Sequence, residues 1–451
     1  MKYKLSPLEI PQDEPFRHDA LDRQPSVEAV ARLIEELQGP FVLAIDSPWG
    51  TGKTTFVQLL KAVLESKDYS CLYFDAWKTD FSTDPLVAFL GEIGTQISSE
   101  IKKDSNFQKA KKIGSQLVKR AIPVAAKIAT AGILDLDAVT EKNIGDGIAD
   151  TLSDAVDDYL EQRGLIEEFR SSLSKVIAKL NEDGKKAQII IFVDEIDRCR
   201  PVYAVELLER IKHLFNIENV IFVISLDKQQ LHNSLGAVYG QGINSDEYLR
   251  RFIDLEYMLP KPDALAFTNN LFNRFEFDRF FAQRTRGEFG YEKQQLIDIV
   301  TELSDAFALS LRAREQCFTR IRVAMMTISE NHPLHPDLLT VLMLLKIATP
   351  EIYRRYAFGG GTAREVIDFL KTKGWSYDMY IELSLVIAKA KSCREEPEEL
   401  QQYRIVAEDH TAEQQERERA QEFLEKYKVG YRQEPPLSYI VNKIELAAQF
   451  R

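Results

Sequence analysis

The chain has 451 residues, of which 45% are hydrophobic and 28% are charged, as is typical of a globular protein. Its formal net charge of −12 argues against broad, non-specific affinity for nucleic acid, because such binding needs a basic surface. Four scattered cysteines without a C-x-x-C pair indicate neither a disulfide framework nor a zinc site, and they suit a reducing cytoplasm. We expect no signal peptide, since the first fifteen residues lack an apolar core.

An apolar run followed by a glycine-lysine-threonine turn is the most informative feature. The run from Phe41 to Ile45 predicts a buried strand, and residues 56–64 predict a helix. Between them lies GTGKT at 50–54, in the strand-to-helix context that a phosphate-binding loop requires. Backbone N–H groups of such a turn, with the helix N-terminus, point at an anion. Ser47 departs from the G-x-x-x-x-G-K-[ST] pattern, because it stands where the first glycine is expected.

We therefore expect this loop to bind a nucleoside triphosphate, ATP, together with Mg²⁺. Lys53 would reach the β- and γ-phosphates, and the Thr54 hydroxyl would ligate the metal ion. Lys53 also counts among the catalytic candidates. The other cofactor-binding candidates in the loop are Trp49, Gly50, Thr51, Gly52 and Thr55.

Residues 96–186 are expected to form a helical insert that is locally basic. Its most apolar piece, 121–134, would span roughly 21 Å as a helix, short of the roughly 30 Å hydrocarbon core. Lys127 lies at its centre and would cost roughly 2.5–3.5 kcal/mol on insertion scales. We predict a packed helix and no clear transmembrane span. Contact with an anionic membrane surface stays open.

A second site element follows a strand-like run at 189–193. This run ends in Asp194 and Glu195, and in a parallel sheet the carboxyl ends of the strands face the nucleotide. Asp194 would hold Mg²⁺, and Glu195 would act as general base toward the attacking water. The alternative is that these carboxylates cap the next helix, which explains one of them but not a buried strand that delivers two.

Further strand signals at 70–77 and 219–227 give an alternation of strands and helices that predicts a doubly wound parallel sheet. A strand between the loop strand and the carboxylate strand, with a glutamate after the metal-binding aspartate, is the pattern of ATPases that hydrolyse through a positioned glutamate. Asp227 would either sense the γ-phosphate or form a turn. An arginine would complete the site, Arg251 in first place. The other candidates are Arg198, Arg200, Arg250, Arg312 and Arg314.

The predicted organisation has four segments. Residues 1–95 hold an N-terminal segment and the first part of a P-loop NTPase core of α/β class, and residues 187–261 hold its second part. The helical insert at 96–186 separates them. After residue 262 the strand signals stop, so 262–451 is expected to form a helical lid or C-terminal domain.

Four motifs in this order resemble the KAP family of P-loop NTPases: WGTGKTTF from 49, FDAW from 74, VDEIDRCRP from 193 and EYLRRFIDLEYMLP from 247. The resemblance covers about residues 15–265 and is interrupted by the insert. It implies an ATPase, often at the membrane, and in bacteria frequently a part of phage defence. By matching position, Lys53, Thr54, Asp194 and Glu195 take the nucleotide and Mg²⁺ roles, and Arg251 takes the basic position after Tyr-Leu. Asp197 and Arg198 match without an assigned task.

We expect a Mg²⁺-dependent ATPase switch that forms a homo-oligomer and controls a protein partner or effector. Its expected place is the cytoplasm, with a peripheral position at the inner face of the membrane left open. Two alternatives remain. A nucleic-acid-dependent motor or loader is not favoured, because the chain is acidic. A non-hydrolysing, nucleotide-gated scaffold is suggested only by Ser47 in place of glycine.

Overall fold

The computed structural model describes residues 10–120, 144–180, 186–282, 290–328, 332–375, 379–392, 396–432 and 434–449. They form two compact units. One holds the described residues up to Asp19 and those from Arg23 to Pro260, and the other holds residues 20–22 and those from Lys261 onward. The apolar piece at 121–134 lies outside the described residues.

The first unit is built on a five-stranded sheet in the order β2-β3-β4-β1-β5, in which every neighbouring pair is parallel. This confirms the predicted α/β class with a parallel sheet. β4 lies between β1 and β3, whereas β2, the strand that comes between them in the sequence, pairs with β3 on its other side at the edge of the sheet. The strands are β1 (Phe41–Asp46), β2 (Ser70–Asp75), β3 (Ile189–Asp194), β4 (Val220–Leu226) and β5 (Leu255–Met258).

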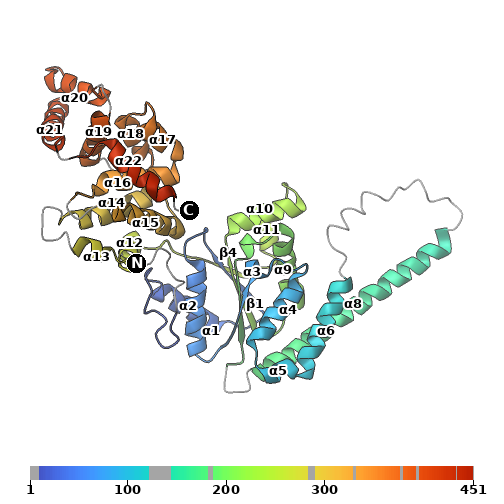
Figure 1. The fold of residues 1–451 in the computed structure, drawn as a ribbon. Coiled ribbons are helices and arrows are strands. Elements are labelled where there is room, and N and C mark those ends of the chain that lie inside the picture. The colour runs from blue at the N-terminus through green and yellow to red at the C-terminus, as the bar shows by residue number, and fades with distance from the viewer. Residues whose placement is uncertain are drawn as a thin grey trace. The chain divides into compact units, whose positions relative to one another are not determined.

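Helices cover both faces of the sheet (Figure 1). On one face, α1 (Gln24–Glu36) and α2 (Lys53–Ser66) pack against alternate strand residues such as Leu43 and Phe192. The intervening residues, Ala44 and Ile191 among them, face the opposite layer. That layer contains α4 (Pro85–Gln96), α9 (Pro201–Leu214) and α10 (Lys228–Tyr239). Burial on both faces explains the continuous apolar runs of β3 and β4.

Short elements join these layers. They are α3 (Ala76–Thr79), the 3-10 helix η2 (Ile196–Arg198) and α11 (Ser245–Leu249). The segment before β3 forms α5 (Ser99–Lys103), α6 (Ser105–Arg120) and α8 (Ile144–Leu180), of which α6 and α8 lie side by side (Figure 1). Phe107 and Phe169 from this pair pack into the core behind β2 and β3. Within the described ranges, we find no helix with the length and hydropathy needed to cross a bilayer.

Among the described residues of the second unit, the regular elements are helices. Phe272, Phe277 and Phe318 pack together in its core, so these aromatic side chains serve packing. Its helices are α12 (Ala264–Arg274), α13 (Phe277–Ala282), α14 (Glu292–Ala306), α15 (Leu311–Met326), α16 (Pro336–Ala348), α17 (Pro350–Phe358), α18 (Ala363–Thr372), α19 (Met379–Ser392), α20 (Glu398–Glu408), α21 (Gln414–Gly430) and α22 (Leu437–Gln449).

Candidate functional site

The predicted site residues follow three neighbouring strands at one edge of the sheet. The loop follows β1, Asp194 and Glu195 lie at the end of β3, and Asp227 follows β4. Because these strands are parallel, their carboxyl ends meet at the same edge. The chain therefore brings together groups that are up to about 180 residues apart in sequence.

The backbone of the loop explains its two glycines. Gly50 and Gly52 have φ angles of 76° and 91°, in the left-handed region that favours glycine. Gly52 precedes the first residue of α2, and its carbonyl accepts the first helical hydrogen bond from Phe56 N at 3.0 Å. The N–H groups of residues 53–55 thus have no partner within the helix, and they form the anion site of a helix N-terminus.

Lys53 is buried at the start of α2. Its ammonium donates to the carbonyl oxygens of Ser47 at 2.5 Å and Pro48 at 3.3 Å, and it lies 4.0 Å from Asp197 Oδ2. Burial lowers the pKa of Lys53, and the Asp197 carboxylate opposes that effect. The Thr54 side chain next to it is exposed, so its hydroxyl is accessible.

Asp194 is held by a residue that the sequence analysis missed. Its Oδ2 accepts a hydrogen bond of 2.8 Å from the hydroxyl of Tyr73 on β2, and its Oδ1 accepts one of 2.9 Å from Glu195 N. Burial and the adjacent Asp194 carboxylate raise the pKa of Tyr73, which keeps the phenol protonated as a donor. The strand predicted at 70–77 contains Tyr73. Its contact with Asp194 depends on the register between β2 and β3, which the sequence of either strand alone does not reveal.

Glu195 is half-buried and has a left-handed backbone with φ 59°. Burial raises the pKa of Glu195, which makes its carboxylate a stronger base, and Arg198 opposes the shift. The Arg198 guanidinium lies 2.7 Å from Glu195 Oε1 and 5.5 Å from the centre of the Trp77 ring. Of the candidate arginines, Arg198 is therefore the one that contacts Glu195.

Arg251 lies elsewhere. It is exposed and stacks at 5.8 Å on the ring of Tyr248. Three residues later, Asp254 N bonds to the carbonyl of Val42 near the beginning of β1, so this stretch runs along the edge opposite to the loop. Within one chain the structure does not bring Arg251 to the phosphate loop. Its role toward a neighbouring chain stays a prediction.

The other candidate arginines have structural partners or exposed side chains. Arg200 pairs with Asp80 at 2.8 Å, and Arg314 pairs with Asp305 inside the second unit. Arg250 pairs with Glu247 at 3.3 Å, and Arg312 is exposed.

Asp227 has two roles in the structure. Its side chain caps α10 through Gln230 N at 3.4 Å and accepts a hydrogen bond of 3.1 Å from Trp49 N. The capping contact agrees with the turn-forming alternative. The contact with Trp49 brings Asp227 to the loop, while contact with a γ-phosphate stays a prediction.

Two further residues near the loop were not assigned a task from the sequence. Asp197 is 5% exposed and accepts a hydrogen bond from the Trp49 indole. Arg23 is 3% exposed, and its guanidinium donates to the carbonyl oxygens of Thr51 at 3.3 Å and Pro260 at 2.6 Å. Arg23 thus ties the loop to the last residue of the first unit.

The donor set fits a magnesium ion that is shared with a phosphate. Mg²⁺ is commonly bound by one or two protein oxygens and by substrate phosphates rather than by a complete protein cage. Thr54 offers an accessible hydroxyl and Asp194 a carboxylate at the same sheet edge. Among the described residues, no group of three His, Cys, Asp or Glu side chains forms a metal site by itself.

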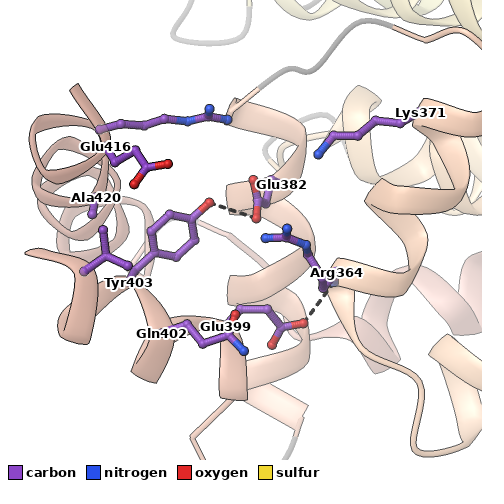
Figure 2. A pocket seen from close by; sticks show the side chains of 10 residues that line it. Arg364, Lys371, Glu382, Glu399, Gln402, Tyr403, Glu416 and Ala420 are labelled. Carbon is purple, nitrogen blue, oxygen red and sulfur yellow. Dashed lines mark hydrogen bonds between the residues drawn. The ribbon is translucent and has the colours of Figure 1, made fainter. Parts of the chain in front are cut away.

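A separate polar cavity of about 290 Å³ lies in the second unit, between α18, α19, α20 and α21 (Figure 2). Inside it, the Tyr403 hydroxyl donates to Glu382 at 3.0 Å, and Arg364 N donates to Glu399 at 3.0 Å. Three basic and three acidic side chains line the cavity, so its charge is balanced and favours no particular class of ligand.

The sequence is similar to known proteins. The chain is 25% identical over 173 residues to an uncharacterised protein of Methanocaldococcus jannaschii, an alignment that covers 34% of this chain and 88% of the relative. The family described as "KAP family P-loop domain" matches residues 23–324, which include every strand of the sheet and the phosphate loop. This match spans more than half of the chain and indicates nucleotide binding and hydrolysis in general terms. The chain therefore belongs to the KAP family of P-loop NTPases.

Proposed function

We propose that this chain binds ATP with Mg²⁺, hydrolyses it, and uses the cycle to control a protein partner. The observation that carries the proposal is the meeting of the phosphate loop, Asp194 and Glu195 at one edge of the sheet, with β4 between β1 and β3. This is the arrangement expected of an ATPase with a positioned glutamate. A small-molecule kinase would need the phosphate loop and Asp194 but not the Glu195 carboxylate.

The residues divide the chemistry among them. The N–H groups of residues 53–55 and the Lys53 ammonium would hold the phosphates, and Thr54 and Asp194 would hold the metal ion. When bound, Mg²⁺ neutralises charge on the transferring phosphate. Glu195 accepts the proton of the attacking water at its carboxylate, and its burial favours that role. Arg198 forms an ion pair with Glu195 and makes the Glu195 carboxylate a weaker base as long as the pair persists.

A protein partner is supported by exposed aromatic side chains near Arg198 and Arg200, which follow Glu195 in the sequence. Trp77, on which Arg198 stacks, is 54% exposed, and Phe81 is 88% exposed. The loop that carries Phe81 is held on both sides, since Arg200 donates to Asp80 and to the carbonyl of Ser82. Contiguous exposed apolar surface is typical of protein interaction sites, and these two rings are the apolar groups that a partner would contact here. We include self-association and a role in phage defence in this proposal, on the ground of family membership.

The test is hydrolysis by the purified full-length chain, with ATP or GTP, in Mg²⁺ or in EDTA. The proposal expects Mg²⁺-dependent phosphate release from ATP that is indifferent to added duplex or single-stranded DNA. Strong stimulation by DNA would replace the protein partner with a nucleic-acid partner. Nucleotide binding without any turnover would support a scaffold that does not hydrolyse.

A further inference from the structure

The Asp197 carboxylate is buried, and within its own turn it is bonded to the backbone N–H of Asp197 itself. It lies in η2, but the backbone bonds of that turn run from Arg198 N to Glu195 O and from Cys199 N to Ile196 O. The Asp197 side chain takes no part in them. Since burying a carboxylate is costly unless it is paired, its contacts with other parts of the chain must account for its position.

Among the described residues, the contacts of Asp197 with other parts of the chain join it to the phosphate loop and to the first residue of α2. Asp197 Oδ2 accepts a hydrogen bond from the indole Nε1 of Trp49, and the same oxygen lies 4.0 Å from Lys53 Nζ. Asp197 Oδ1 is enclosed and accepts no hydrogen bond from another described residue. The carboxylate therefore connects the segment after β3, which carries Glu195, with the loop after β1.

Trp49 is the residue of the phosphate loop that Asp197 contacts by a hydrogen bond. Its indole bonds to Asp197 after β3, and its backbone N bonds to Asp227 after β4 at 3.1 Å. The side chain is 46% exposed, so packing alone does not fix it. Two carboxylates from two neighbouring strands thus set where this part of the loop lies.

We propose that Asp197 is a positioning residue that acts through Trp49 to hold the phosphate loop in register with Asp194 and Glu195. The inference rests on the proposed ATPase function and adds a residue to it. Asp197 is acidic and lies beside the lysine that would meet the phosphates, so it does not itself attract a triphosphate. Its loss should therefore slow the chemical step without weakening nucleotide binding.

The test is a double-mutant cycle of Trp49→Phe and Asp197→Ala in the full-length chain. Turnover of ATP, affinity for a fluorescent ATP analogue and Tm are measured for each variant. We expect each single variant to lose about 10- to 100-fold in turnover, the range typical of a supporting residue. The double variant should be no slower than the slower single variant, because both changes break one contact. Asp197→Asn keeps an acceptor for the indole and should recover part of the rate.

A matched control separates positioning from loss of stability. Asp84 is a carboxylate of similar burial, 8% exposed, that caps α4 and pairs with Arg210. Asp84→Ala should lower Tm, and its effect on turnover should multiply with that of Trp49→Phe. If the effects of Trp49→Phe and Asp197→Ala also multiply, or if Asp197→Ala keeps normal turnover, the inference is wrong.

The outcomes distinguish this inference from the proposed function. If the wild-type chain hydrolyses ATP and the Asp197 variants behave like it, the ATPase proposal stands and Asp197 has no positioning role. If the wild-type chain binds nucleotide without turnover, both proposals fail, because the effect expected of Asp197 is on the chemical step and not on affinity. A wild-type chain that binds no nucleotide removes both proposals together.

Discussion

The Tyr73 hydroxyl on β2 donates a hydrogen bond of 2.8 Å to the Asp194 carboxylate on β3. Asp194 is 1% exposed, and its other oxygen accepts from the backbone of Glu195. A carboxylate fixed at both oxygens has one orientation. Partners of this kind orient metal ligands in other proteins and tune their affinity.

Replacing Tyr73 by Phe removes this donor and keeps the ring. We expect the Mg²⁺ concentration for half-maximal hydrolysis to rise about 10-fold, because Asp194 is less well oriented toward the metal ion. Titration of Mg²⁺ at saturating ATP measures the effect. Tyr203→Phe is the matched control, since its hydroxyl contacts Thr79 at 3.2 Å and not Asp194. An unchanged Mg²⁺ requirement in Tyr73→Phe would show that the bond does not support metal binding.

Lys53→Ala removes the cation of the phosphate loop. We expect loss of nucleotide binding, because no other lysine follows the loop glycines at the helix N-terminus. Equilibrium binding of a fluorescent ATP analogue gives the answer. Lys61→Ala serves as control, since this lysine lies on the same helix and pairs with Glu65 at 2.7 Å. Undiminished affinity in Lys53→Ala would contradict the assignment of the site.

Glu195→Gln removes the proposed base and keeps the shape of the side chain. The variant should bind ATP normally and hydrolyse it about 10²- to 10⁴-fold more slowly, the usual contribution of a general base. Single-turnover hydrolysis separates this step from binding. Glu206→Gln is the control, because burial also raises the pKa of this half-buried carboxylate on α9. Normal turnover in Glu195→Gln would place the base elsewhere.

The strands that hold the site could be predicted because they are buried on both faces. The runs at 41–45 and 189–193 consist of apolar residues, as expected of strands that are buried on both faces. The structure extends each strand by one residue, to Asp46 and Asp194. β5 was missed because it is a short edge strand with exposed side chains, among them Met258 at 65%. A half-exposed edge leaves no apolar run to detect.

The supporting residues of the site could not be predicted for a different reason. Lys53, Thr54, Asp194 and Glu195 lie in local motifs, whereas the partners of Asp194 and Trp49 come from segments 121 and 148 residues away. Such contacts depend on strand order and register, which a local motif does not contain. Arg251 was predicted to complete the site only because of its position in a motif. The structure places Arg251 at the edge of the sheet opposite to the phosphate loop.

The second unit should show a pH-dependent stability that originates at Asp337. This carboxylate on α16 is 5% exposed and accepts a hydrogen bond of 2.5 Å from Ser384 Oγ. Burial, with the nearby Glu434 charge, raises the pKa of Asp337 from 3.8 to about 6. Glu434 is itself paired at 3.0 Å with His335. The folded state therefore binds the Asp337 proton more tightly than the unfolded state does.

This difference in pKa determines whether stability rises or falls with pH. Because the folded pKa is the higher one, Asp337 adds stability at low pH, and this stability is lost as pH rises from about 4 to about 6. Each unit of pKa difference corresponds to about 1.4 kcal/mol. Asp337→Asn does not titrate and keeps an acceptor for Ser384. Its Tm minus that of the wild type should therefore increase across pH 4 to 6 and stay constant above.

Thermal unfolding of the two full-length proteins between pH 4 and 8 measures this difference. The control is Asp298→Asn, a change of an exposed aspartate on α14 in the same unit, which measures the effect of removing a carboxylate that is not buried. A Tm difference that does not change with pH would mean that Asp337 is as easily ionised in the folded chain as in the unfolded one.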